Sequence, residues 1–331
     1  MEATDIFQAP IIDRLSVRVV VDSRYERFMP KAEHAQMRIE HVGVIPEKHM
    51  HTFACEWGLS LHIATETRSA RAQYLLDFGF TPEVLVHNFN LMSLDPTKLD
   101  GLILSHGHRD HFGGLDGFVD NFQGTLRPDL DLVVGGETVF REKFVKSAEG
   151  EMVSWGTLDR DGLHARHIGT VCCGEPHAME GAFTTGYIER NSFETVTGGS
   201  MVVDYDHYTE DERGGKLVKD MHPDEHATCF IIQGRGLVVI SSCGHVGLIN
   251  TIKTAMAVAN VDKLHAVLGG FHLGAAPDDY IENTVDELEA LDPDIVLPMH
   301  CSGEKFINAM RRRLPQKLVT SNVGSSFTFG V

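Results

Sequence analysis

The first third of the chain has the hydrophobic pattern of β-strands. Residues 15–23 are rich in β-branched side chains, residues 58–67 alternate apolar with polar positions, and residues 73–79 form a short apolar run closed by glycine. Such runs, with flanking turn residues, are typical of strands. We therefore predict consecutive antiparallel strands, followed by a helix over 83–92 and a buried strand over 98–106.

The pattern changes to helical spacing soon after that buried strand. Apolar residues within 115–122 recur at intervals of three, four and seven positions, which puts them on one face of a helix. Residues 106–111 therefore lie on a loop between a strand and a helix. Farther along the chain, we predict a strand over 129–136 and a short helix over 138–145.

The C-terminal half alternates strands with helices. Two apolar runs, 227–233 and 236–243, are joined by turn glycines and predict a β-hairpin. Strand and helix patterns then alternate, and the last residues, 317–330, predict an edge strand. Periodicity is weak over about 150–225, and the sequence contains no internal repeat. We therefore expect one domain over 1–331 with an insertion at about 150–225.

Composition and charge narrow the class of protein. Hydrophobic residues make up 42% of the chain and charged residues 23%, as in ordinary soluble domains. The 29 Lys and Arg against 47 Asp and Glu give a net charge of −18, which disfavours nucleic acid and anionic membrane surfaces as partners. The sequence shows no membrane-spanning run or secretory signal, so we expect a cytoplasmic protein. We expect a small-molecule partner and leave a homo-oligomer open.

Histidine is unusually frequent, with 19 in the chain, and four metal-binding side chains fall within six residues. They are His106, His108, Asp110 and His111. Alternate positions on an extended chain point the same way, so His106 and His108 can share one ion. Asp110 and His111 follow at the turn into the helix and face a second ion, while two glycines behind them allow close packing. Packing alone does not explain this cluster.

The HxHxDH pattern behind a buried strand resembles the signature of the metallo-β-lactamase superfamily. The resemblance extends over about residues 15–310. Within the superfamily, the sequence resembles the dihydropterin ribofuranosylaminobenzene phosphate synthase-like branch. Five further segments carry it: Gly-Leu-Ser at 58–60, Leu-Asp-Phe-Gly at 76–79, Ser-Ser-Cys-Gly-His at 241–245, Gly-Gly-Phe-His-Leu at 269–273 and His-Cys-Ser-Gly at 300–303. It implies the α/β class, a four-layer αββα sandwich (the metallo-β-lactamase fold), and a dinuclear-metal, mostly hydrolytic enzyme.

The resemblance also implies roles for residues outside the cluster. His300, at the end of an apolar strand, is the expected last ligand, and Asp77 is expected to orient a ligand loop. The superfamily usually supplies a bridging carboxylate where this chain has Cys243. We predict His245, two residues on, as the missing ligand, with His226 as the alternative and a Cys243 thiolate as a third reading. The missing carboxylate leaves the number of bound ions open.

His272 follows a strand and a Gly-Gly pair on the same predicted rim, so we expect it to face the substrate or act as an acid or base. Asp110 would bind one ion and orient a hydroxide held between two ions. These residues predict a metal-dependent hydrolase that uses a metal-activated hydroxide on a small ester, phosphoester or lactone-like metabolite. The expected cofactors are two divalent metal ions; the many imidazoles favour zinc, with manganese and iron left open.

Two other functions remain as alternatives at this point. One is a di-iron redox enzyme on the same scaffold, and the other is a metal-dependent ligand-binding or sensor protein. We expect substrate specificity to come from the loops around the metal rim, within residues 24–57 and 150–225.

Overall fold

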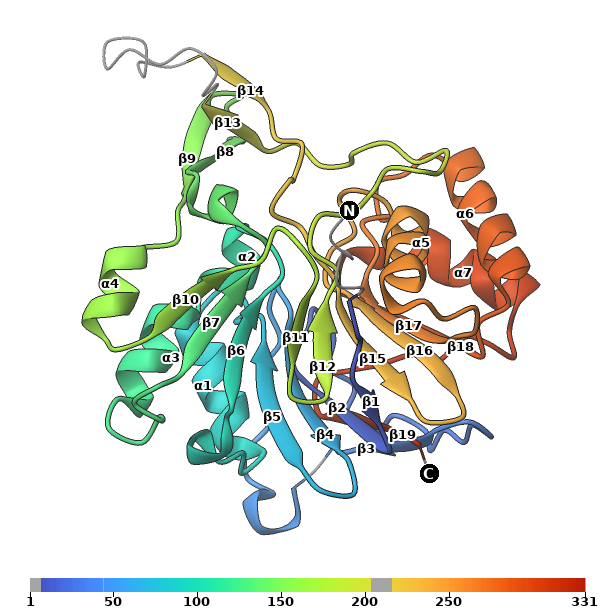
Figure 1. Cartoon of the computed structure of the whole chain (residues 1–331), viewed down its shortest axis with the longest axis horizontal. Coiled ribbons are helices and arrows are strands. Elements are labelled where there is room, and N and C mark those ends of the chain that lie inside the picture. The colour runs from blue at the N-terminus through green and yellow to red at the C-terminus, as the bar shows by residue number, and fades with distance from the viewer. Residues whose placement is uncertain (1–6, 44, 204–215, 331) are drawn as a thin grey trace, which may run out of the picture.

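Two large β-sheets form the centre of the computed structural model, which describes residues 7–43, 45–203 and 216–330 (Figure 1). The first sheet has eight strands, of which β2, β4 and β5 are antiparallel and β5, β6, β7 and β10 are parallel. Across the sheet the order is β10 (Gly169–Cys172), β7 (Asp131–Val134), β6 (Gly101–Leu104), β5 (Arg71–Leu76), β4 (Ser60–Glu66), β2 (Arg14–Val21), β19 (Ser325–Phe329) and β3 (Arg38–His41).

The second sheet has seven strands and contains the predicted hairpin. Its order is β11 (His177–Met179), β12 (Ala182–Thr184), β15 (Thr228–Ile232), β16 (Gly236–Ser241), β17 (Leu264–Gly270) and β18 (Ile295–Met299), with β1 (Ile11–Ile12) beside β15. β15 and β16 pair antiparallel, whereas β16, β17 and β18 are parallel. Parallel strands end at the same edge of a sheet, so the loops after β16, β17 and β18 lie together.

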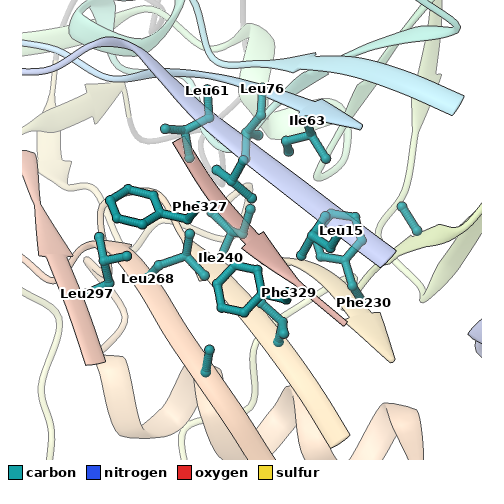
Figure 2. Close-up of a cluster of buried hydrophobic side chains, with 14 of the residues drawn as sticks. Leu15, Leu61, Ile63, Leu76, Phe230, Ile240, Leu268, Leu297, Phe327 and Phe329 are labelled. Atoms are coloured by element: carbon teal, nitrogen blue, oxygen red, sulfur yellow. The ribbon is translucent and has the colours of Figure 1, made fainter. Parts of the chain in front are cut away.

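The two sheets pack face to face around a core that both of them supply. Figure 2 shows side chains of the two sheets pointing toward one another between the layers. The first sheet contributes Leu15, Leu61, Ile63, Leu76, Phe327 and Phe329, and the second contributes Phe230, Ile240, Leu268 and Leu297. These side chains are almost completely buried, so this interface forms one of the apolar layers of the fold.

Helices cover the outer faces of both sheets. The first sheet is covered by α1 (Pro82–Leu91), α3 (Leu115–Phe122) and α4 (Arg160–Ala165), and the second by α5 (Leu248–Ala259), α6 (Asp278–Leu291) and α7 (Glu304–Arg313). Within residues 7–43, 45–203 and 216–330, the remaining helices are α2 (Arg109–Phe112) and the 3₁₀ turns η1 (Pro46–Lys48), η2 (Pro96–Lys98), η3 (Glu137–Phe140) and η5 (His300–Ser302). The layers therefore follow the predicted αββα order. Among the described residues, no helix is long and apolar enough to cross a membrane.

A third, smaller sheet projects from the main body beside α2 (Figure 1). It consists of β14 (Leu217–Lys219), β13 (Met201–Val203), β8 (Lys143–Lys146) and β9 (Met152–Gly156). The predicted helix over 138–145 is wrong, because the chain makes only the turn η3 there and then enters β8. β8 pairs with β9 and with β13, and a partner more than fifty residues away leaves no trace in local periodicity.

The segment 150–225, expected to be an insertion, is distributed over all three sheets. β9, β13 and β14 belong to the small sheet, β10 extends the first large sheet, and β11 and β12 extend the second. Residues 204–215 of this segment lie outside the described residues. The expected edge strand at the C-terminus is also placed differently: β19 pairs with both β2 and β3 and so lies inside the first sheet.

Candidate metal centre

The loops after β6, β16, β17 and β18 meet at one end of the sandwich and bring the predicted site residues together. α2 begins directly after His108, and the chain packs closely behind it. A Cβ atom on Gly113 would come within 2.2 Å of the Phe80 carbonyl oxygen, and one on Gly114 within 2.2 Å of the Phe78 oxygen. Only glycine permits this approach, as the sequence pattern predicted.

Three of the predicted ligands form one compact group: His106, His108 and His245. One ring nitrogen of each lies within 4.8 Å of the others, and all three side chains are buried. Nε2 of His106 and Nε2 of His245 have no hydrogen-bond partner among the described residues. Nε2 of His108 lies 3.0 Å from the Ser200 hydroxyl, which leaves its Nδ1 for an ion. Converging, unpartnered nitrogens in a buried space are what a metal ion would satisfy.

The other three predicted ligands form a second group beside the first: Asp110, His111 and His300. Oδ2 of Asp110 lies 3.4 Å from Nε2 of His300 and 4.0 Å from Nε2 of His111. Within the described part of the chain, the Asp110 Oδ1 atom, the His111 Nε2 atom and both ring nitrogens of His300 lack hydrogen-bond partners. The rings of His106 and His111 are 4.3 Å apart, so the two groups share one space.

Asp77 holds the His111 ring from behind. Its Oδ2 lies 2.8 Å from Nδ1 of His111 and accepts from the Ser105 hydroxyl at 2.9 Å, while its Oδ1 accepts from the Ser105 backbone N–H at 2.8 Å. The same hydroxyl lies 3.0 Å from Nδ1 of His106. Asp77 therefore fixes one ring directly and a second ring through Ser105, and leaves Nε2 of each toward the shared space.

We expect Asp77→Asn to weaken metal binding about 10- to 100-fold, because the neutral amide cannot replace a carboxylate that accepts from three donors. Competition against a chromophoric chelator measures the affinity. Asp95→Asn, which changes an exposed carboxylate that caps η2, is the matched control. Equal affinities for Asp77→Asn and the control would contradict the orienting role.

The segment 224–226 ties the ligand loops together. Asp224 Oδ2 accepts from the backbone N–H of Gly107 at 2.8 Å. Glu225 accepts from the backbone N–H groups of His245 at 2.9 Å and Val246 at 2.8 Å, and burial raises its pKa to about 7. Two consecutive carboxylates thus position the loop after β6 and the loop after β16.

His226, the alternative to His245 as a ligand, makes hydrogen bonds to the backbone at the end of β6. Its Nε2 donates to the carbonyl oxygen of Leu104 at 2.9 Å, and its backbone N–H donates to the carbonyl oxygen of Ser105 at 3.2 Å. It therefore packs beneath the loop after β6, while His245 stands beside His106.

Several residues at the site were missed by the sequence analysis. The ring of His222 stacks on His245 at 4.1 Å with an angle of 8°, and it lies 4.9 Å from the ring of His108. Asp22 accepts from the backbone N–H of His300 at 2.9 Å. The alternation of acidic residues and histidines over 220–226 was a usable signal for His222, whereas Asp22 gave none.

Lys143 was also missed, and it is buried behind the metal-binding groups. Its Nζ atom lies 2.8 Å from Asp220 and 3.4 Å from Asp224, and its side chain is only 1% exposed. Burial alone would lower the pKa of Lys143, but the two carboxylates raise it. The ammonium thus links β8 of the small sheet to the segment that holds Gly107.

The charge state of the three rings in the first group suits metal binding. Burial, together with neighbouring positive charges, lowers the pKa of His106, His108 and His245 well below its usual value, so these imidazoles are neutral. A neutral imidazole is the form that binds an ion. Burial would also lower the pKa of His111, but the adjacent carboxylates outweigh it and raise that pKa to about 9. Contacts with His111 and His300 overcome burial at Asp110 and lower its pKa.

A cavity of about 300 Å³ opens onto both groups. Both tryptophans of the chain line it. The ring of Trp57 lies 4.8 Å from that of His300, and the ring of Trp155 on β9 lies 5.0 Å from that of His108. The segments expected to set specificity, 24–57 and 150–225, therefore each place one large aromatic side chain at the cavity.

His272 lines the same cavity, as expected for a residue that faces substrate. Its ring lies 4.2 Å from the ring of His245, and its Nδ1 lies 3.4 Å from the Cys243 sulfur. Burial alone would lower the pKa of His272, but Cys301 and nearby carboxylates raise it. A rim histidine with a raised pKa is able to carry a proton near neutral pH.

Proteins of similar sequence are found among known proteins. The sequence profile of the metallo-β-lactamase superfamily matches residues 71–143. A protein of Methanocaldococcus jannaschii named 7,8-dihydropterin-6-methyl-4-(β-D-ribofuranosyl)-aminobenzene-5′-phosphate synthase is 27% identical over 285 residues, or 84% of this chain and 91% of that protein. An uncharacterised protein of the same organism is 26% identical over 237 residues, or 71% of this chain and 81% of that protein.

The fold is also found among solved structures. A crystal structure described as a metal-dependent hydrolase of the β-lactamase superfamily has a TM-score of 0.69 and 21% sequence identity, and the match covers 94% of this chain and 98% of that one. At this identity the likeness establishes the fold. With the profile match over residues 71–143 and the αββα layers, it shows that the chain has the metallo-β-lactamase fold.

Proposed function

We propose that the protein is a metal-dependent hydrolase of a small ester, phosphoester or lactone-like metabolite. One observation carries the proposal: two groups of buried, unpartnered metal-binding atoms among the described residues share one space at the wall of a cavity. The group of His106, His108 and His245 would hold one ion, and the group of Asp110, His111 and His300 would hold a second. The many imidazoles favour zinc, with manganese or iron as alternatives.

When bound, the metal ions supply Lewis acidity toward the scissile group and make a water molecule more acidic. Asp110 lies between His111 and His300 with Oδ1 unpartnered in the described residues, so it can orient a nucleophilic water. His272 faces the cavity with a raised pKa and can give a proton to the leaving group. Trp57 and Trp155 line the cavity beside these residues.

The cavity also supports a proposal about the substrate's size and charge. Its volume of about 300 Å³ is at the lower end of ordinary small-molecule sites. The net charge of −18 disfavours nucleic acid and anionic membranes as partners and is consistent with a small metabolite in the cytoplasm. A metal centre supplies the local positive charge that a small anionic substrate needs.

Turnover of a substrate panel tests this proposal. We expect the zinc- or manganese-loaded protein to hydrolyse at least one member of a panel of carboxylic esters, phosphodiesters and lactones, and His108→Ala to abolish that turnover. His164→Ala changes an exposed histidine on α4 and is the matched control. If the metal-loaded protein turned over no panel member, or if His108→Ala behaved like His164→Ala, hydrolysis would be excluded as proposed.

A synthase reaction is the second candidate, because the 27% identical relative is named a synthase and the alignment covers 91% of it. Mass spectrometry distinguishes the two. Formation of the compound in that relative's name from a ribofuranosylaminobenzene phosphate and a dihydropterin that carries a leaving group such as diphosphate on its 6-methyl carbon, with release of that leaving group and a proton, would favour synthesis. Its absence beside panel turnover would favour hydrolysis.

A further inference from the structure

The outer face of the first sheet carries a second cavity, separate from the metal-binding groups. The apolar cluster beneath α1, α3 and α4 includes residues of β5, β6 and β7 but none of the described residues of β3 or β19. On this uncovered part of the sheet, side chains of β2, β4, β19 and β3 line a cavity of about 430 Å³. Residues 92–94, which follow α1, form one side of it. None of the six metal-binding side chains lines it.

Strand register puts Arg18 at the centre of this cavity. Leu15 and its alternate neighbours on β2 point into the core between the sheets, so Arg18 points outward. It lies opposite His62 of β4 on one side and Ser326 of β19 on the other. The next row on the same face consists of small side chains: Thr328, Ser16 and Ala64. The cavity therefore has a floor of small side chains and hydroxyls beside a partly buried arginine.

Positive charge predominates in this cavity, although the chain as a whole has a net charge of −18. Three arginines line it, and the one lining carboxylate, Glu40, is paired with Arg38. The guanidinium groups of Arg14 and Arg18 make no hydrogen bond or ion pair with the residues that the structure describes. Burial lowers the pKa of Arg18 more than the charge of Glu40 raises it. Arg18 is therefore a partly buried cation without a full counter-charge.

Two neighbouring side chains do not change this balance. Nε2 of His62 donates to Oε1 of Gln73 at 3.0 Å, and burial lowers the pKa of His62 to about 4, so this ring is neutral at physiological pH. Glu66 lies across the ladder from Arg14, but its carboxylate is paired with Arg71 at 2.7 Å. The uncompensated positive charge in the cavity thus belongs to guanidinium groups.

The donors of the cavity match a phosphate group. A guanidinium presents two parallel N–H donors to the oxygens of a phosphate and keeps its charge at any physiological pH. The hydroxyls of Ser16 and Thr328 lie 3.4 Å apart on the floor and supply further donors. Several cations around one floor favour an anion with more than one negative charge over a single carboxylate. Met92 and Leu94 add an apolar side against which an organic group can pack.

We propose that this cavity is a binding site for a phosphorylated small molecule, with the phosphate on Arg18 and the organic part against Met92 and Leu94. Arg14 and Arg38 supply the neighbouring positive charge. The site is distinct from the metal centre, and the inference does not depend on the proposed hydrolysis.

Isothermal titration calorimetry of the full-length, metal-loaded protein tests this inference. The probes are inorganic phosphate, glycerol 3-phosphate and adenosine 5′-monophosphate, with acetate as a monovalent anion. Because a metal centre can also bind phosphate, each titration is repeated in the His108→Ala background. We expect both backgrounds to bind at least one phosphate ester more tightly than inorganic phosphate, and acetate to bind more weakly than either. Esters that bind at least tenfold more weakly than inorganic phosphate would overturn the assignment of an organic ligand.

Variants of the lining residues locate the binding. Arg18→Gln should weaken phosphate-ester binding by about tenfold or more, because it removes a charged donor pair. Glu40→Gln should strengthen binding about two- to fivefold, because it removes the lining carboxylate. Arg311→Gln, at an exposed arginine on α7, is the matched control and should match wild type. Circular dichroism checks the fold, and if Arg18→Gln does not fold, Glu40→Gln and Arg14→Gln decide, the latter by weakening binding.

The outcomes separate this inference from the proposed function. Equal affinities in Arg18→Gln and Arg311→Gln, or loss of all phosphate binding in the His108→Ala background, would assign the anion to another site and overturn the inference. Acetate binding as tight as phosphate-ester binding would show a non-selective cationic surface and would also overturn it. Binding that responds to Arg18 and Glu40 in a protein that turns over no panel substrate would support the inference and contradict the proposed hydrolase alone.

Discussion

Replacing Lys143 with methionine should lower the free energy of unfolding by about 3–5 kcal/mol, because the change leaves buried carboxylates without their counter-charge. Lys143 Nζ lies 2.8 Å from Asp220 and 3.4 Å from Asp224, and all three side chains are at most 1% exposed. Methionine fills most of the same volume, so the loss reports the charge and hydrogen bonds rather than a cavity. Equilibrium urea unfolding of the metal-free protein measures it.

Lys305→Met provides the comparison. Lys305 Nζ lies 2.9 Å from Oδ1 of Asp278, close to the 2.8 Å between Lys143 and Asp220. Both side chains of the Lys305 pair, however, are more than half exposed. An exposed pair contributes about 0–1 kcal/mol, so the control should change the unfolding free energy only within that range. If Lys143→Met changed the unfolding free energy by a similarly small amount, the ion pairs of Lys143 with Asp220 and Asp224 would not be the stabilising contacts proposed here.

The contacts of Lys143 connect the small sheet to the loop that carries the metal-binding histidines His106 and His108. β8 carries Lys143, which holds Asp224, and Asp224 accepts from Gly107 in the loop of His106 and His108. β9 of the same sheet carries Trp155 into the cavity. Changes in the small sheet can therefore alter both ligand geometry and substrate space without touching a metal-binding residue.

The sequence was informative wherever structure and chemistry are local. The HxHxDH cluster lies within six residues, and its strand-to-helix setting follows from flanking periodicity, so it could be predicted that His106, His108, Asp110 and His111 lie at one strand-to-helix connection. Asp110 and His111 differ from the prediction in lying within the short helix α2 and not in the loop. The same holds for the β15–β16 hairpin, whose two strands are adjacent in sequence. His245 was chosen over His226 through resemblance, because both lie near hairpin ends and spacing alone does not separate them.

The parts that could not be predicted depend on contacts between distant segments. Lys143 and Asp220 are 77 positions apart, and neither shows in its own neighbourhood that the other will be buried against it. β8 was predicted as helix although it pairs along its length with the nearby strand β9, and its one residue pair with β13 is invisible to a short window. The backbone conformation of His300 could not be predicted either. Its φ of +48° is rare for residues other than glycine, and the sequence gives no sign of it.

Asp110→Asn is expected to lower kcat/KM for the best panel substrate by about 10²- to 10⁴-fold, the range for loss of a positioned acid–base group. Asparagine keeps the size of the side chain but loses the charge that lies 3.4 Å from His300 and 4.0 Å from His111. Steady-state kinetics at saturating metal measures the loss. Asp116→Asn, an exposed position at the start of α3, is the control and should retain wild-type activity.

Metal content measured on the same samples separates the two roles proposed for Asp110. If Asp110→Asn keeps both ions and loses activity, the carboxylate acts mainly by orienting the nucleophilic water; if it loses one ion, its main role is as a ligand of the second group. Full activity with both ions bound would contradict either role.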